Sequence, residues 1–405
     1  MSDTREVVIT GYGLNCVLGR DLDVVTAALR AGRAGTFERW QPAVDAGARC
    51  QLLGIVEDPI VIEKQSSRFM GKAARLAYGA AKRALAMAEI SDPGPLGVVV
   101  GSGTGDVEAH RETKAKLDET RNAKKVSPTL IPRIMSSTVS ANLATVLAAR
   151  GPSFSVAAAC AGGSYNVLLA AQLIAAGHVD GAIAGGVEVA DIHFHSGFDA
   201  MRAYNGHDND TPGRASRPYA ADRAGFIFSE GAGVLVLEAR ETALARGATI
   251  RGRLLGFGMS SDGTGEMVAP SPSGQIAAMR AALAHARLSP DQIDYVNTHG
   301  TSTPAGDVSE VRAIREVMGG RRVPYGSTKA YTGHTISAAG AIEAIFSLSM
   351  IEGGFIAPSA NASPLDPELA DYPPVLEPRS AELRYVLSNS FGFGGTNVTL
   401  VLGRA

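Results

Sequence analysis

The chain has 405 residues, which is enough for about two or three domain-sized units with buried cores. Apolar residues make up 45% and charged residues 19%, a balance that is typical of a globular protein and excludes a largely disordered chain. Because 38 Lys and Arg nearly cancel 40 Asp and Glu, a general electrostatic attraction to nucleic acid or to an anionic membrane is not expected.

The cysteines and the apolar segments indicate a reducing, cytoplasmic compartment. Cys16, Cys50 and Cys160 form no Cys-x-x-Cys pair, so we predict neither a disulfide framework nor a bound metal. The amino terminus runs directly into the strand-like residues 7–10 without the apolar stretch of a signal peptide. The uncharged run 151–179 is interrupted by proline and paired glycines, so we predict a buried strand and helix there, with no membrane span.

The chain contains an internal repeat. Two apolar runs close with Gly-aromatic-Gly, and each is followed in the same order by a helical pattern, a strand and a final Gly-rich strand. The repeated segments, each with its counterpart, are 7–13 and 254–258, 68–90 and 274–287, 96–101 and 294–300, and 231–237 and 395–402. Such a repeat predicts a duplicated α/β unit whose sheets are covered by helices.

The two predicted halves are unequal in length. The first spans residues 1–245 and the second spans residues 246–405. The excess lies in segments 105–140 and 190–228, which interrupt the first copy. We expect these insertions to form a subunit interface and the walls of a substrate site.

Cys160 is the candidate nucleophile. It lies between a predicted buried strand at 153–159 and a predicted helix at 161–176. Because the unpaired N–H groups at a helix start favour an anion, we expect this thiol to ionise more readily than a free cysteine. The alternative is a small buried hydrophobic residue. The pair Gly162-Gly163 favours catalysis, because these residues cost helix stability and allow close approach of a substrate.

Two histidines and a lysine lie at equivalent strand ends of the second half. His299 follows a predicted strand that breaks into a polar loop, a common site position in α/β sheets. In the internal repeat, the turn that contains His334 corresponds to the turn that contains Cys160. The pseudo-twofold symmetry is therefore expected to bring His334 close to Cys160, with His299 nearby. Lys329 is either a solvated surface residue or the partner of Glu343 in a buried ion pair that orients the site.

Segment 390–397 is glycine-rich and lies between two predicted strands. Its N–H groups are suited to an oxyanion hole, and Phe391 or Phe393 to a hinged wall. The alternative is a tight turn with two buried aromatic residues. No helix follows, so the segment is not a dinucleotide-binding motif.

These motifs match those of a known family in order and spacing. Ala159-Cys160-Ala161, Thr298-His299-Gly300-Thr301 with Asp307, and the segment 329–334 carry the likeness. Nearly the whole chain resembles the β-ketoacyl-acyl-carrier-protein synthases of bacterial fatty-acid synthesis, most closely the synthase I type. The resemblance implies a thiolase fold of five layers, αβαβα, with duplicated halves related by a pseudo-twofold axis. It also implies a homodimer.

The resemblance further implies the reaction and its catalytic residues, Cys160, His299, His334 and Lys329. Cys160 would take an acyl chain from the phosphopantetheine arm of acyl carrier protein. Malonyl carrier protein would then lose carbon dioxide while the two histidines stabilise the enolate, which attacks the acyl thioester. This is a decarboxylative Claisen condensation in chain elongation, with no cofactor bound by the enzyme.

Other roles are implied in the same way. The backbone N–H groups of Cys160 and Phe393 would form the oxyanion hole, and Phe391 would be the gate. The remaining implied residues are the supporting Glu343 and Asp307 and the pantetheine-binding Thr301 and Thr303. Because the carrier protein is acidic, a local basic rim is expected. Its candidates are Lys64, Arg68, Lys72, Lys124 and Lys125.

Three positions depart from the family pattern. Gly162-Gly163 stand where Thr or Ser is usual, Ser337 stands where Gly is usual, and Asn15-Cys16 replace a Ser-Pro-like pair. None of these changes removes a catalytic group. They leave open a specialised ketosynthase of a polyene or secondary-lipid pathway.

Related enzyme classes predict different residues. Thiolases use a second cysteine in the carboxy-terminal half, and residues 246–405 contain none. Priming synthases pair Cys and His with Asn, whereas this chain has His334. Non-catalytic chain-length partner subunits usually lack the nucleophile, which is present here as Cys160. We therefore expect an elongating enzyme.

Overall fold

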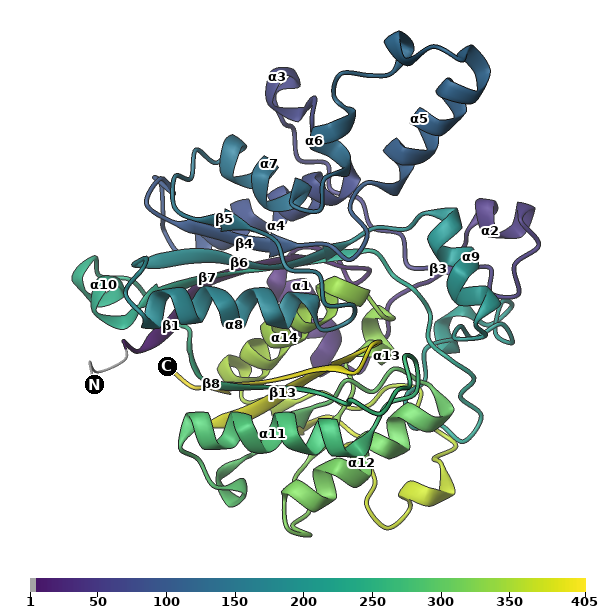
Figure 1. Cartoon of the computed structure of the whole chain (residues 1–405). Helices are drawn as coiled ribbons and strands as arrows, with labels where there is room; N and C mark the ends of the chain where they lie inside the picture. The colour runs from purple at the N-terminus through teal and green to yellow at the C-terminus, as the bar shows by residue number, and fades with distance from the viewer. Residues whose placement is uncertain (1–4) are drawn as a thin grey trace.

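The computed structural model describes residues 5–405, so the first four residues of the predicted first half lie outside the described part. The ten-stranded sheet folds into two layers, and Figure 1 shows these with helices on their outer faces and two further helices, α8 (Gly162–Ala175) and α14 (Ala339–Gly353), between them. The layers thus run α, β, α, β, α. This confirms the predicted thiolase fold.

The strands of the two halves follow the same order. The first half has the order β1-β7-β6-β4-β5 and the second has β8-β14-β13-β9-β10. The two sets join where β1 and β8 pair antiparallel, through Val8 with Arg253 and Ile9 with Gly252. The bounds are β1 (Val7–Asn15), β4 (Gly97–Gly101), β5 (Ser153–Phe154), β6 (Gly181–Glu188), β7 (Gly231–Ala239), β8 (Gly252–Ser261), β9 (Tyr295–Asn297), β10 (Tyr325–Gly326), β13 (Tyr385–Gly392) and β14 (Thr396–Gly403).

The Gly-aromatic-Gly repeat has a packing cause. Helix α4 (Lys72–Met87) crosses β1, and a Cβ added at Gly13 would lie 2.3 Å from the carbonyl oxygen of Ala80. Helix α11 (Pro272–Ala286) crosses β8 in the same manner, and a Cβ at Gly258 would lie 2.0 Å from the carbonyl oxygen of Ala278. Only glycine lets the helix backbone approach the strand this closely.

The outer layers are completed by α7 (Thr138–Val146) over the first sheet and α12 (Pro304–Val317) over the second (Figure 1). Central helix α14 is buried along nearly its whole length because it lies between the two sheets. Within residues 5–405, segment Ile336–Gly353 is the one helical stretch long and apolar enough to cross a membrane, and 89% of it is buried inside the molecule. Its composition is therefore that of a core helix.

The two predicted insertions contain elements without a counterpart in the second half. Segment 105–140 forms α5, η1 and α6 and begins α7, and segment 190–228 forms α9 and η2. The remaining bounds are α1 (Leu22–Arg30), β2 (Glu38–Arg39), α2 (Gln41–Asp45), β3 (Leu52–Leu53), α3 (Lys64–Ser67), α5 (Val107–Thr120), η1 (Ala123–Lys125), α6 (Leu130–Ile134), α9 (Ile192–Ala200), η2 (Pro212–Arg214), α10 (Arg240–Ala245), η3 (Pro290–Gln292), α13 (Lys329–Thr332), η4 (Ile336–Ala338), β11 (Phe355–Ile356), η5 (Pro367–Leu369) and β12 (Arg379–Ser380).

Two local predictions were wrong. The predicted buried strand at 153–159 is only the two-residue β5, and Ser153 is exposed because β5 is the last strand at the sheet edge. The predicted turn at 390–397 is shorter, because β13 continues through Gly392 and β14 begins at Thr396. Apolar composition identified the first segment and glycine content the second, but neither showed where strand pairing ends.

Candidate active site

Cys160, His299 and His334 converge at the base of a cavity of about 440 Å³. The sulfur of Cys160 and one ring nitrogen from each histidine all lie within 4.8 Å of one another, and all three residues are buried. Cys160 lies between β5 and α8, His299 follows β9, and His334 lies between α13 and η4. The structure thus brings together residues from both halves of the repeat.

A sharp turn presents Cys160. Ala159 adopts a left-handed conformation with φ of 44°, which is strained for a residue with a Cβ and costs about 1–3 kcal/mol. Two residues after Cys160, α8 begins with Gly162 and Gly163. A Cβ at Gly162 would lie 2.5 Å from the hydroxyl oxygen of Ser337, and one at Gly163 would lie 2.7 Å from the Ser337 carbonyl oxygen. The two glycines therefore let the nucleophile helix pack against the segment that carries His334.

The expectation that Cys160 ionises readily was wrong. Burial raises the pKa of the Cys160 thiol to about 11, and the nearby Glu188 carboxylate adds to this, although the charge of Lys329 lowers it. The backbone N–H groups of Phe393 and of Cys160 itself also lower this pKa by hydrogen bonding to the sulfur. Desolvation exceeds these favourable contributions. The resting site therefore holds a thiol whose sulfur already faces two backbone donors.

His334 is arranged as a hydrogen-bond donor toward the cavity. Its Nδ1 accepts from the backbone N–H of Ile336 at 3.3 Å, so the proton of the neutral ring lies on Nε2. That Nε2 is buried and has no hydrogen-bond partner within residues 5–405. Burial holds the pKa of His334 and of His299 well below the usual value, and the charge of Lys329 contributes to both shifts. Both rings are thus neutral at pH 7.

The Cys160, His299 and His334 group also has the ligand types of a zinc site. Metal binding by His334 through Nε2 would require this nitrogen to lose the proton that the Ile336 contact holds there, and the Lys329 charge opposes a cation. The arrangement therefore favours an anion over a metal ion.

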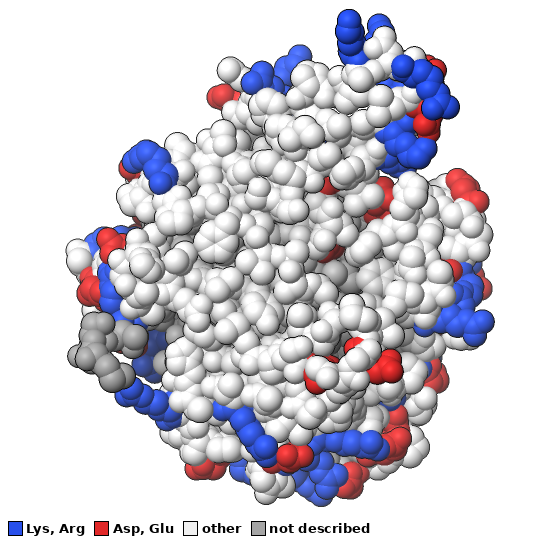
Figure 2. Space-filling view, viewed as in Figure 1, with Lys and Arg blue, Asp and Glu red and all other residues white. Residues whose placement is uncertain are grey.

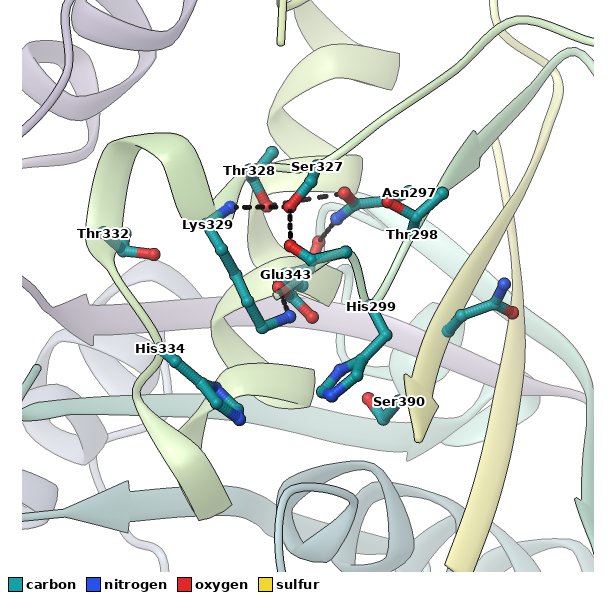
Figure 3. A network of polar contacts seen from close by, with 12 residues as sticks. Asn297, Thr298, His299, Ser327, Thr328, Lys329, Thr332, His334, Glu343 and Ser390 are labelled. Carbon is teal, nitrogen blue, oxygen red and sulfur yellow. Dashed lines mark hydrogen bonds and ion pairs between the residues drawn. The ribbon is translucent and has the colours of Figure 1, made fainter. Parts of the chain in front are cut away.

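Lys329 and Glu343 form a fully buried ion pair behind the histidines. Figure 3 shows the Lys329 side chain reaching Glu343 between the segments that carry His299 and His334. Burial raises the pKa of Glu343 to about 7, although Lys329 opposes that shift. The two segments are also joined by Ser327, whose hydroxyl donates to the carbonyl oxygen of Gly300 at 2.6 Å. Of the two alternatives for Lys329, the structure has the buried pair.

Sequence reasoning missed Glu310. Its carboxylate accepts from the backbone N–H groups of His299 at 2.9 Å and Gly300 at 2.8 Å, and from Asn389 at 3.0 Å. Burial raises its pKa to about 7. Glu310 lies three residues after Asp307 on α12, so helical periodicity places both on the buried face. That spacing was the one available signal.

Asp307 supports the loop after His299 and touches no reacting group. Its carboxylate accepts from the backbone N–H of Ser302 at 3.1 Å and of Tyr219 at 2.9 Å. The guanidinium of Arg223, another residue that sequence reasoning missed, lies 3.4 Å from the same carboxylate and donates to the carbonyl oxygen of Thr303 at 3.0 Å. These contacts fix the loop backbone.

The remaining predicted site residues line the same cavity. Thr301 and Thr303 lie on its wall, with their hydroxyl groups 3.0 Å apart. Phe391 is buried against the ring of His299, with ring centres 6.2 Å apart, and Phe393 also lines the cavity. The structure therefore brings both threonines and both aromatic residues to the cavity that Cys160, His299 and His334 line.

The five predicted docking residues do not line this cavity. All five are exposed, and the ammonium of Lys72 also lies 2.6 Å from the buried carboxylate of Glu230. Figure 2 shows Lys and Arg side chains gathered at the end of the molecule that carries α3 and α5, while the central part of this face is almost free of charged side chains.

Comparisons with known proteins cover nearly the whole chain. The family described as Beta-ketoacyl synthase, N-terminal domain, matches residues 4–243, and Beta-ketoacyl synthase, C-terminal domain, matches residues 251–363. Among curated proteins, 3-oxoacyl-(acyl-carrier-protein) synthase 1 of Escherichia coli strain K12 is 42% identical over 98% of this chain and 98% of its own length.

Solved structures give the same result. A β-ketoacyl synthase from Burkholderia phymatum is similar with a TM-score of 0.93 and 35% identity, over 99% of this chain and 100% of the other. The ketosynthase ApeO from Xenorhabdus doucetiae, solved in complex with its chain length factor, has a TM-score of 0.85 and 28% identity over 99% of this chain and 98% of its own.

Proposed function

Because this chain belongs to the β-ketoacyl synthase family, and its relatives are 3-oxoacyl-acyl-carrier-protein synthases, we propose that Cys160, His299 and His334 carry out the condensation. The enzyme is an acyltransferase that forms a carbon–carbon bond, joining an acyl thioester to malonyl carrier protein in fatty-acid chain elongation. A specialised secondary-lipid ketosynthase is not favoured by these relatives. The single observation that supports the site is the 4.8 Å clustering of the thiol and both imidazoles.

The first step is transfer of the acyl chain to Cys160. The sulfur attacks the thioester carbonyl carbon, a new carbon–sulfur bond forms, and the thiol of the carrier arm leaves with the proton that Cys160 loses. The backbone N–H groups of Cys160 and Phe393, which already face the sulfur, stabilise the tetrahedral oxyanion. Removing one such donor typically costs about 3–4 kcal/mol of barrier.

The second step is decarboxylation of the malonyl thioester. Cleavage of its carbon–carboxylate bond releases carbon dioxide and leaves an enolate, whose oxygen receives hydrogen bonds from His334 Nε2–H and from a ring N–H of His299. Because both imidazoles are neutral donors in a buried cleft, they stabilise the oxygen more strongly as its charge grows. Lys329, paired with Glu343, adds positive potential without a free proton at the reacting atoms.

In the third step the enolate carbon attacks the acyl carbon on Cys160. A carbon–carbon bond forms, the carbon–sulfur bond breaks, and Cys160 leaves as a thiolate that takes up one proton from solvent. The β-ketoacyl chain remains on the phosphopantetheine arm that brought the malonyl group. We further assign Thr301 and Thr303 to the amides of this arm and Phe391 to the gate beside His299, since all three line the cavity. The exposed Lys64, Arg68, Lys72, Lys124 and Lys125 are the proposed docking cations for the acidic carrier protein.

A panel of acyl carrier proteins tests the assignment. The protein is incubated with each one, and the acyl adduct is located by intact mass and peptide mapping. We expect one acyl group on Cys160, no adduct in Cys160→Ala, and an unchanged adduct in the matched variant Cys50→Ala, which removes another buried thiol. Acylation at any residue other than Cys160 would refute the proposal.

The oligomer is proposed to be a homodimer formed at the β5 edge. An edge strand presents unpaired N–H and C=O groups, and Ser153 in β5 is exposed at the end of the ten-stranded set. The face seen in Figure 2, on which β5 and α8 lie, is almost uncharged at its centre. Light scattering at micromolar concentration should give twice the mass of one chain, and a monomer mass would contradict the proposal.

A further inference from the structure

The catalytic cavity contains a single permanently charged cation. Of the residues that line it, only Arg202 is a lysine or arginine. Its side chain is exposed, and within residues 5–405 no carboxylate lies within 4.0 Å of its guanidinium. The neighbouring Asp199 pairs with Arg49 at 3.5 Å. Arg202 therefore places an unpaired positive charge on the cavity wall.

The backbone fixes the position of Arg202. It follows α9 in a left-handed conformation with φ of 57°, and its N–H donates to the carbonyl oxygen of Asp199 at 3.0 Å. The next N–H, that of Ala203, donates to the carbonyl oxygen of Phe198 at 3.2 Å. These two bonds close the helix end and anchor the arginine beside the cavity.

The same wall carries an apolar rim. Met201, Met267 and Val268 line the cavity and are 48%, 70% and 50% exposed, which places them at its mouth. Such exposed apolar side chains around a cavity mark a ligand-binding surface. The two carboxylates of the lining are engaged by other groups: Asp262 accepts from Asn397 at 2.7 Å, and Glu310 accepts from the His299 loop.

The order of these groups matches the chemistry of a phosphopantetheine arm. From its reactive end outward, the arm carries a thioester, two amides, a dimethyl-substituted carbon and then a phosphate ester. The cavity offers Cys160 at its base, the hydroxyl pair of Thr301 and Thr303 on its wall, an apolar rim at its mouth and the cation Arg202 beside that rim. Arginine binds phosphate oxygens with charge-assisted, often bidentate hydrogen bonds.

We propose that Arg202 binds the phosphate ester of the substrate's phosphopantetheine arm, while Met201, Met267 and Val268 enclose the adjacent dimethyl group. This rests on the proposed function, because it requires Cys160 to react with a thioester on such an arm. The first turn of α12, Pro304–Gly306, lies on the same cavity wall and adds a favourable field for the anion that Arg202 holds.

Two synthetic thioesters that differ only in the phosphate test the proposal. The rate of Cys160 acylation is measured by intact mass with an acyl-phosphopantetheine and with the same acyl-pantetheine. We expect the wild-type enzyme to prefer the phosphorylated donor about tenfold in kcat/KM at low salt. The preference should shrink as salt rises, because the contact is exposed.

Variants separate this contact from general damage. In Arg202→Gln the kcat/KM ratio of the phosphorylated to the unphosphorylated donor should fall to about one, because the positive charge is lost. Arg202→Lys should retain part of the preference, because lysine keeps the charge but not the bidentate geometry. The matched control is Arg287→Gln, because Arg287 is also exposed and also lies in a left-handed conformation (φ 55°) at a helix end, but does not line the cavity. It should keep the wild-type preference.

The outcomes are distinguishable. If neither donor acylates Cys160 in the wild-type enzyme, the proposed function itself fails. If both donors react equally in the wild type, or if Arg202→Gln keeps the tenfold preference, the function stands and the phosphate contact is refuted. A variant that lowers both rates by the same factor would leave the ratio unchanged and would also count against the proposal.

Discussion

The contact between Gly162 and Ser337 gives a test of how the two halves position the nucleophile. A Cβ at Gly162 would meet the Ser337 hydroxyl oxygen at 2.5 Å, which is a side-chain atom. A Cβ at Gly163 would meet the Ser337 carbonyl oxygen at 2.7 Å and the Ala341 nitrogen at 3.2 Å, which are backbone atoms. Replacing Ser337 by glycine removes the first clash and leaves the second.

The magnitudes follow from these distances. Overpacking in Gly162→Ala costs about 1–3 kcal/mol, and the gain in helix propensity returns at most about 1 kcal/mol. Ser337→Gly removes a buried hydroxyl that has no hydrogen-bond partner within residues 5–405, a gain that offsets the entropic cost of glycine of about 0.5–1 kcal/mol. We therefore expect a coupling of about 1–2 kcal/mol in favour of the double variant Gly162→Ala with Ser337→Gly.

The assay is a double-mutant cycle by urea unfolding, with the Cys160 acylation rate measured on each variant. The matched cycle uses Gly163→Ala, for which Ser337→Gly should give a coupling below about 0.5 kcal/mol because the obstructing atoms are backbone. Adding Ser337→Gly should restore both the stability and the acylation rate of Gly162→Ala, and neither of those of Gly163→Ala. Equal coupling at both positions, or none at position 162, would show that this packing does not set the position of the nucleophile.

Three further outcomes are expected. Lys329→Met should destabilise the fold by about 3–5 kcal/mol in urea unfolding, because it leaves the Glu343 carboxylate buried and unpaired. The double variant with Glu343→Leu should recover most of that loss. Full stability of Lys329→Met alone would contradict a buried pair. The rate of Cys160 alkylation by iodoacetamide should rise about tenfold per pH unit from pH 7 to 9 without a plateau, because the thiol pKa of about 11 lies above this range. A plateau below pH 8 would show that the helix field outweighs burial. His334→Ala should lower carbon dioxide release from malonyl carrier protein about 100- to 1,000-fold through loss of the Nε2–H donor, measured with labelled malonyl, and an unchanged rate would remove His334 from the enolate site.

Local pattern in the sequence was sufficient for the repeat, the order of the elements and the prediction that Cys160, His299 and His334 lie close together. The Gly-aromatic-Gly segments lie in two strands that each pack closely against a helix. Because this close packing requires glycine at fixed positions, it leaves a local pattern in the sequence. It was not sufficient for the edge strand at β5, because apolar residues at a sheet edge look the same as those in its interior.

What the sequence by itself determined was the duplicated α/β architecture and the presence of one thiol, two imidazoles and a lysine at equivalent strand ends. Only the tertiary structure decided their chemical state. Burial raises the pKa of Cys160 although the Lys329 charge lowers it, the Ile336 N–H selects the tautomer of His334, and no carboxylate among residues 5–405 pairs with Arg202 at the cavity. Each of these depends on desolvation and on contacts between residues distant in the chain, quantities that no local pattern encodes.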